Sequence, residues 1–269
     1  MIRVAAVGDV HMDVDVLGRY RPSLEQLGGT ADVLLLAGDL TRHGTVDEAQ
    51  CVAREFGDLP VPVIAVLGNH DHHSDQPREV TKVLASAGIT VLEGDGITIS
   101  CRDAKLGVAG VKGFGGGFAG RCASMFGEPE IKDFVRTTER SANRLQAALL
   151  SLDCDVLVAM THYAPVPDTL CGEPLEIYPF LGSYLLGHAI DAAPTALAVH
   201  GHAHAGVERG ITPGGVRVRN VAHPVIRQAY SVYQLELPSA SRMPVSQGQA
   251  GVSTRCRTMS DVRRRDVHP

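Results

Sequence analysis

The sequence predicts an α/β domain built in layers. Through the first two-thirds of the 269 residues, apolar strands rich in Val, Leu, Ile and Ala alternate with segments of helical pattern. The apolar runs are continuous, which is typical of strands buried on both faces of a sheet. Strands that alternate with helices favour an α/β arrangement over an all-β or all-helical one.

The strands divide into long and short ones. Long apolar runs are followed by a polar cluster, whereas the short ones at 96–100 and 105–111 are joined by a tight turn and predict an antiparallel ribbon. Strands are expected at residues 3–9, 32–39, 61–69, 89–94, 96–100, 105–111, 155–162, 195–201, 216–222 and 231–237.

Two helices between the early strands carry clear end signals. Thr45 with Glu48 three residues later is a capping-box pattern, and Gly57 is expected to end that helix. A second helix should begin near Pro77 and end at Gly88.

The second half is less regular. A third helix is expected over 137–151, with irregular segments at 113–136 and 164–190 that we expect to roof the site. Residues 1–237 are predicted to form one domain. Residues 238–269 contain little apolar sequence and are predicted to be a disordered, Arg-rich tail.

Composition and charge exclude several classes of protein. No apolar run approaches the roughly 20 residues of a membrane span, and the N-terminal stretch MIRVAAVGDVH does not resemble a signal peptide. The six cysteines form no C-x-x-C pair, so we expect reduced thiols and a cytoplasmic protein. The oligomeric state stays open.

The charge of the chain is uneven. The net charge is −5, but the tail holds six Arg and two Asp, which leaves 19 basic against 28 acidic residues in 1–237, or −9. Binding to nucleic acid is therefore predicted to be unfavourable, because affinity for a phosphate backbone depends largely on Lys and Arg.

Polar clusters follow five of the apolar strands. In an open α/β sheet, ligands bind outside the carboxyl ends of the strands. Residues two apart in an extended strand also share a face, so Asp9 and His11 are expected to face one side, as are His202 and His204. The clusters read G-D-V-H at 8–11, G-D at 38–39, G-N-H-D at 68–71, T-H-Y at 161–163 and G-H-A-H at 201–204.

The residue types in these clusters indicate a metal site. Carboxylate, imidazole and amide groups suit Mn²⁺, Fe and Zn²⁺, and no soft thiolate ligand is present. The seven candidate ligands are too many for one ion and fit two that share a carboxylate. They are Asp9, His11, Asp39, Asn69, His162, His202 and His204. His200 lies inside its apolar run and is expected to be a buried, hydrogen-bonded histidine.

In their order and residue types, the clusters resemble those of the calcineurin-like metallophosphoesterases, and the resemblance covers about residues 1–235. It implies a four-layer sandwich of two mixed β-sheets flanked by helices, with two metal ions at the C-terminal strand ends. By this resemblance Asp39 bridges the ions. The first ion is then held by Asp9, His11, Asp39 and His204, and the second by Asp39, Asn69, His162 and His202.

The resemblance also implies a chemistry. A metal-bound hydroxide attacks phosphorus, and two ions clamp the phosphate oxygens. His70 follows the ligand Asn69 but holds no metal in the family pattern, so it is the candidate general acid. Asp71 either orients a histidine or caps the following helix, and His72 and His73 are expected to be solvated loop residues.

Within the family, the sequence favours a small substrate. The protein phosphatases continue G-D-x-x-D-R-G, whereas residues 38–44 read G-D-L-T-R-H-G, and the chain more closely resembles compact bacterial phosphodiesterases. We therefore expect hydrolysis of a small phosphodiester or phosphomonoester, with manganese as the preferred metal. A nuclease and a non-catalytic interaction scaffold of the same fold remain alternatives.

Overall fold

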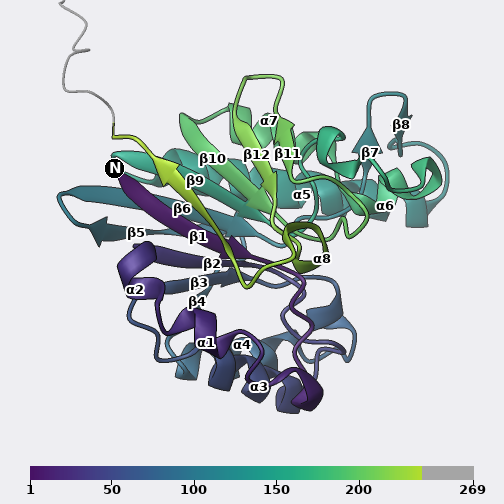
Figure 1. Cartoon of the computed structure of the whole chain (residues 1–269). Coiled ribbons are helices and arrows are strands. Elements are labelled where there is room, and N and C mark those ends of the chain that lie inside the picture. The colour runs from purple at the N-terminus through teal and green to yellow at the C-terminus, as the bar shows by residue number, and fades with distance from the viewer. Residues whose placement is uncertain (238–269) are drawn as a thin grey trace, which may run out of the picture. The chain divides into compact units, whose positions relative to one another are not determined.

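A computed structural model of the chain is shown in Figure 1, and it describes residues 1–237. Two mixed β-sheets lie face to face, and helices cover the outer face of each sheet, so the predicted four-layer α/β sandwich is confirmed. The predicted tail, 238–269, lies outside the described residues.

The first sheet has five strands. Four of them run parallel, and the last strand within residues 1–237 pairs antiparallel with β1. The order is β13 (Ser231–Leu235), β1 (Ile2–Val7), β2 (Val33–Ala37), β3 (Val63–Val66) and β4 (Ile89–Val91).

The second sheet has six strands. The predicted ribbon is confirmed as the antiparallel pair β5–β6, but β6 also pairs in parallel with β9, so the ribbon forms one side of the large sheet. The edge strand β11 was not expected from the sequence. The order is β11 (Arg209–Ile211), β12 (Arg217–Asn220), β10 (Thr195–His200), β9 (Val156–Thr161), β6 (Ala104–Val111) and β5 (Asp95–Cys101).

Alternation along the buried strands separates the apolar layers. In β2, Leu35 points into the layer between the two sheets, whereas Leu34 and Leu36 pack against the helices. Both faces of the strand are therefore buried, and this explains why its sequence is an unbroken apolar run.

The helices over the first sheet begin and end close to where the sequence places them. Thr45 Oγ1 accepts from the Glu48 amide at 3.2 Å, and the Glu48 carboxylate accepts from the Thr45 amide, also at 3.2 Å, so the capping box is confirmed. These helices are α1 (Arg21–Leu24), α2 (Leu27–Thr30), α3 (Val46–Phe56) and α4 (Pro77–Ser86).

The helices over the second sheet correct the sequence reading. Helix α5 spans Pro129–Ser151 and so begins eight residues before the predicted 137. Pro129 suits the first turn of a helix, and Phe134 anchors the second turn by packing on Phe114, with ring centroids 5.1 Å apart. Helix α7 (Tyr184–Asp191) lies partly in the segment expected to be irregular, and Ser183 caps its N-terminus.

Short elements make up the rest of the two irregular segments and the loops. A hairpin of β7 and β8 stands beside α6, and a bridge joins Gly117 to Ser183 (Figure 1). The short elements are η1 (Val14–Val16), η2 (His70–His72), β7 (Gly117–Phe118), β8 (Arg121–Cys122), η3 (Asp168–Leu170), η4 (Leu175–Ile177), α6 (Tyr178–Leu181) and α8 (His223–Ile226). Across residues 1–237, none of the helices is long and apolar enough to cross a bilayer.

Candidate metal centre

The polar clusters meet where the carboxyl ends of both sheets come together. Strands β1, β2 and β3 of the first sheet and β9 and β10 of the second each lead into one cluster. Parallel strands end at a common edge, so residues far apart in the sequence become neighbours there.

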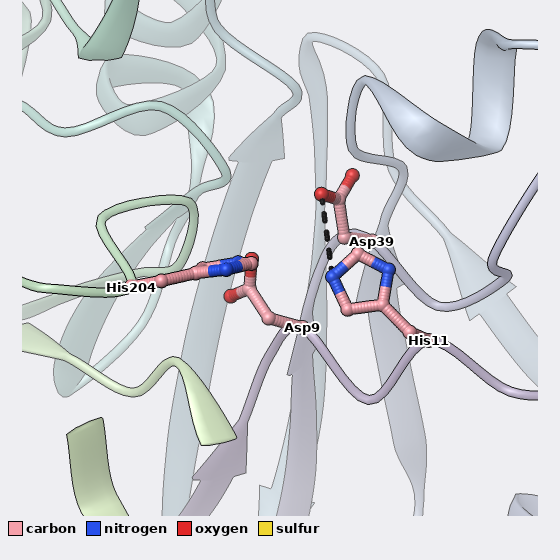
Figure 2. Close-up of side chains that lie close together, drawn as sticks. All are labelled: Asp9, His11, Asp39 and His204. Atoms are coloured by element: carbon pink, nitrogen blue, oxygen red, sulfur yellow. Dashed lines mark hydrogen bonds and ion pairs between the residues drawn. The ribbon is translucent and has the colours of Figure 1, made fainter. Parts of the chain in front are cut away.

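The first group of candidate ligands is Asp9, His11, Asp39 and His204. Each offers one atom, and these atoms lie within 4.8 Å of one another. His204 Nε2 lies 2.8 Å from Asp9 Oδ1, and His11 Nε2 lies 3.9 Å from Asp39 Oδ2 (Figure 2). The group therefore joins three loops of the two sheets.

The second group shares Asp39 with the first. Asp39, His162 and His202 bring their ligand atoms within 4.8 Å of one another. Asn69 belongs to the same cluster, because its Oδ1 lies 2.9 Å from His162 Nε2. All seven predicted ligand positions thus converge, with Asp39 common to the two groups. Their role as metal ligands remains a prediction.

The hydrogen bonds around His162 fit a cation. Its Nδ1 lies 2.9 Å from the Ala37 carbonyl, which can only accept, so the proton sits on Nδ1. In the neutral ring, Nε2 then carries a lone pair and can only accept. It lies 2.9 Å from Asn69 Oδ1 and 3.3 Å from Asp39 Oδ1. Three acceptor atoms turned toward one another are satisfied by a metal ion placed among them.

The backbone at the site is strained. Asp9, His11, Asp39 and His202 have positive φ angles of 55°, 43°, 50° and 72°. Each such residue costs on the order of 1–3 kcal/mol, and such strain clusters at functional sites. Asp9 and His11 face one side, as expected, because both belong to the first group, but they do so without being part of a strand. β1 ends at Val7 and β10 at His200, so loops place both pairs of candidate ligands.

Two glycines make room for the ligands. At Gly38, which has φ of +83°, a Cβ would stand 2.6 Å from His162 Nδ1. At Gly68, a Cβ would collide with the Asp39 carboxylate. Side chains at these two positions would displace the shared carboxylate and its neighbour, so the glycines in G-D and G-N serve close approach as well as turning.

Burial keeps several imidazoles neutral. Desolvation lowers the pKa of His202 to about 3, with His162 adding repulsion, and lowers the pKa of His11 to about 4. The neutral imidazole is the form that binds metal. His204 differs, because its hydrogen bond to Asp9 raises its pKa.

The two central carboxylates respond differently to burial. Desolvation raises the pKa of Asp39, and the nearby Asp9 adds to the effect. For Asp9, burial also acts to raise the pKa, but the hydrogen bond from His204 and the proximity of His162 outweigh it, so the pKa lies below its usual value. An ionised Asp39 is thus costly until a cation compensates it.

His70 lies beside both groups without joining either. Its Nδ1 lies 2.8 Å from the Arg42 carbonyl, which fixes the ring, and its Nε2 lies 3.9 Å from Asp39 Oδ2. Its side chain is 44% exposed, so Nε2 can reach a bound molecule. This position fits the predicted acid, whose role remains a prediction.

Asp71 has neither of the two roles expected for it. It is fully buried, and its carboxylate accepts from the amides of Leu40, Thr41 and Gly68 and from the Thr41 hydroxyl. It therefore ties the loop after β2 to the loop after β3. These loops carry Asp39 and Asn69, so the buried Asp71 fixes the spacing between these two candidate ligands.

Two other histidines were predicted from the same pattern. His200 is completely buried, with Nε2 2.8 Å from Thr169 Oγ1 and Nδ1 2.7 Å from the Gly201 carbonyl, so that prediction is confirmed. The prediction of a solvated His72 was wrong. His72 is half-buried in η2, and desolvation lowers its pKa to about 4. His73 is exposed, as expected.

A third cluster also meets within 4.8 Å. It contains Asp13, His43 and Glu48. Glu48 already accepts from the His43 and Thr45 amides, and Asp13 pairs with Arg42 at 2.9 Å. We assign no ion to it, because its carboxylates are satisfied by protein groups.

Comparison with known proteins decides the family. The model of the calcineurin-like phosphoesterase family matches residues 2–206. The chain belongs to that family. Calcineurin-like phosphoesterases are metal-dependent hydrolases, and the clusters described above supply the His and Asp groups that a metal requires. No curated protein matches the sequence.

Solved structures of this phosphoesterase fold agree with the family assignment. Phosphopantetheinyl hydrolase from Mycobacterium tuberculosis superposes with a TM-score of 0.61 at 15% identity, over 90% of this chain and 98% of that one. The TT1561 protein of Thermus thermophilus gives a TM-score of 0.52 at 17% identity, over 81% and 88%. At these identities, the similarity establishes the fold of the phosphoesterase and nothing finer.

Sequence reasoning missed three features at the edge of the phosphoesterase site. The Phe180 carbonyl lies 3.2 Å from His202 Nε2, and the Tyr163 ring packs on the His202 ring with centroids 4.4 Å apart. Lys112 follows β6, and its carbonyl accepts from the His162 and Tyr163 amides. Desolvation lowers the pKa of its ammonium group. A basic residue one position past a strand was the only sequence signal for it.

Proposed function

We propose that this protein hydrolyses a small phosphodiester or phosphomonoester with two metal ions that share Asp39. The observation that carries the proposal is that Asp39 belongs to both groups. Its buried carboxylate offers an oxygen within 4.8 Å of the ligand atoms of His11 and His204, and an oxygen within 4.8 Å of those of His162 and His202. Two ions that share a ligand are the arrangement that clamps a phosphate during in-line displacement.

The donor set supports manganese, with iron or zinc as alternatives. Oxygen and imidazole ligands suit all three metals, and no thiolate takes part. When bound, such ions supply positive charge to the phosphate and lower the pKa of a water molecule that serves as nucleophile.

The chain's own residues would do the rest. His162, held by the Ala37 carbonyl, and Asp39, held by the His70 amide at 2.8 Å, keep fixed positions. His70 stands with Nε2 open to solvent and Nδ1 anchored on Arg42, which suits proton donation to the leaving alkoxide. The leaving group would depart on the side where His70 lies.

A substrate panel with each metal in turn tests the proposal. Purified protein stripped of metal and reloaded with Mn²⁺, Fe²⁺ or Zn²⁺ is offered bis-nitrophenyl phosphate, nitrophenyl phosphate, a cyclic nucleotide and duplex DNA. A phosphopantetheinyl ester joins the panel because of the solved hydrolase with the same fold.

We expect metal-dependent turnover of a compact ester, two ions per chain by elemental analysis and little cleavage of the duplex. One ion per chain at saturation would contradict the shared carboxylate. Duplex cleavage that falls steeply with added salt would identify a nuclease, and no turnover with any metal would favour an interaction scaffold.

A further inference from the structure

A pocket of about 330 Å³ opens beside the candidate metal centre, between the end of β6 and helix α5. Its α5 wall is formed by Thr137, Arg140, Ser141 and Arg144. These residues repeat at intervals of three and four, so they lie on one face of the helix. Lys112 also lines the pocket, and its backbone carbonyl accepts from the amide of the candidate ligand His162 at 2.9 Å.

Lys112 connects the pocket to the centre through one aromatic ring. Its Nζ lies 5.4 Å from the centre of the Tyr163 ring and 5.3 Å from that of Phe114. The Tyr163 ring also packs on the His202 ring, with centroids 4.4 Å apart. One ring therefore contacts both the Lys112 ammonium and a candidate metal ligand, which places the pocket next to the metal centre.

The cations of the pocket are under-compensated. Glu93 is the one acidic residue that lines it. The Glu93 carboxylate pairs with Arg144 at 3.6 Å and accepts from the backbone amide of Lys112 at 3.1 Å. Within residues 1–237, the Lys112 ammonium and the Arg140 guanidinium have no carboxylate oxygen within 4.0 Å. Three cations against one carboxylate give the pocket a local charge of about +2, in a body of net charge −9.

One further polar atom in this wall lacks a partner. Ser141 Oγ is buried, and among the described residues it is the one buried side-chain oxygen or nitrogen without a hydrogen bond. Buried hydroxyls without a partner are uncommon in folded proteins. In the described part of the chain, the wall of the pocket thus combines a hydroxyl that has no hydrogen-bond partner with positive charges that have no counter-ion.

We propose that this pocket binds a second, terminal phosphate group of the substrate while the metal centre holds the phosphate ester that is cleaved. A phosphate monoester carries a charge of about −1.5 to −2 at neutral pH, which balances the pocket. Arginine suits it further, because its guanidinium can donate two parallel hydrogen bonds to phosphate oxygens. This inference rests on the proposed function and specifies its substrate as a compact phosphodiester with an additional phosphate.

A matched pair of substrates tests the pocket. One is the nitrophenyl phosphodiester of thymidine, and the other is the same ester with a phosphate on the free sugar hydroxyl. Both release nitrophenol by the same reaction. A charge-assisted contact should favour the phosphorylated ester about 10- to 100-fold in kcat/KM, mainly through KM, because it binds ground state and transition state alike.

The variants are Lys112→Met, Arg140→Gln and the control Lys105→Met. Lys105 lies near the start of the same strand β6, is exposed and pairs with Asp153 at 3.5 Å. Lys112→Met and Arg140→Gln should both lose most of the preference. Arg140→Gln should also keep the turnover of the plain ester, and Lys105→Met should keep both the preference and the turnover. Arg140 is exposed, so its replacement leaves folding intact.

Binding without turnover separates this inference from the proposed function. Calorimetry with thymidine bisphosphate and metal-stripped protein in EDTA should show binding in the unmutated protein and in Lys105→Met, and none in Lys112→Met. If both esters are turned over with no preference and Lys112→Met has no effect, the proposed phosphate pocket is refuted, while the proposed hydrolase activity stands. If binding depends on Lys112 but no metal supports turnover, the proposed hydrolase activity is refuted, while the phosphate pocket stands.

Discussion

Replacing Asp39 with Asn should abolish the gain in stability that metal provides. Asp39 is 1% exposed and belongs to both groups of candidate ligands, so its loss removes a ligand from each. A ligand at one hundred times its dissociation constant stabilises the folded state by about 2.7 kcal/mol. Two ions would therefore contribute about 5 kcal/mol, or about 10–20 °C in Tm for a domain of this size.

The metal-free protein should respond in the opposite direction. Burial and the proximity of Asp9 raise the pKa of Asp39, so the folded state holds this proton more tightly than the unfolded chain does. That contribution is present at low pH and is lost as the pH rises from the ordinary value near 3.8 through the raised one. Asp39→Asn has no carboxyl group to ionise, so it avoids this loss of stability as the pH rises. In EDTA the Tm of the variant should therefore match or exceed that of the unmutated protein at neutral pH, and the difference should shrink toward pH 4.

Calorimetric melting in EDTA and in Mn²⁺ measures both effects, because the chain has no tryptophan for a fluorescence assay. Asp153→Asn is the matched control, since Asp153 is 99% exposed and far from either group. Elemental analysis should give two ions for the unmutated protein, about one for His11→Ala and almost none for Asp39→Asn. A full ion retained by Asp39→Asn, or an unchanged Mn²⁺ shift in Tm, would refute the shared carboxylate.

Three further substitutions separate the roles of neighbouring residues. His70→Ala should keep both metals and lose about 100- to 10,000-fold in kcat on an alkyl leaving group, with a much smaller loss on nitrophenolate; equal losses on both would argue against proton donation. Asp71→Asn should lower stability by about 1–3 kcal/mol, because its amide cannot accept from all the donors that surround Asp71, and calorimetry would show no loss if the tie between the loops is unimportant. His200→Ala should destabilise by a similar amount, because it removes a completely buried ring together with its hydrogen bonds to Thr169 and Gly201, and a loss of metal in elemental analysis would show that His200 is a ligand after all.

The sequence predicted those features of the fold that depend only on residues close together in the chain. The capping box at Thr45 and the unbroken apolar run of β2 follow from the hydrogen-bonding and burial of adjacent residues. The candidate ligand residues could be named because each follows a strand. Their conformation could not, because the positive φ of Asp9 and His11 depends on contacts from loops distant in sequence.

Some of the contacts that sequence reasoning could not predict are made by the backbone. The partners that hold His162 and His70 are backbone carbonyls of Ala37 and Arg42, which every residue type possesses. Net charge could not reveal the basic pocket for a related reason. A body of net charge −9 still gathers Lys112 and Arg140 in one pocket, because only the fold brings the end of β6 and α5 together.

The contact between Asp9 and His204 spans 195 residues, and β13 pairs with β1 at the far end of the described chain. Contacts this distant in sequence close late, since the entropy of a long loop must be overcome before they form. During synthesis, the ribosome releases Asp9, Asp39 and Asn69 well before the histidines of the second sheet. A nascent chain therefore presents the candidate ligands of the first sheet, His11 among them, before those of the second sheet. Both groups are complete only when the C-terminal strands have emerged and folded.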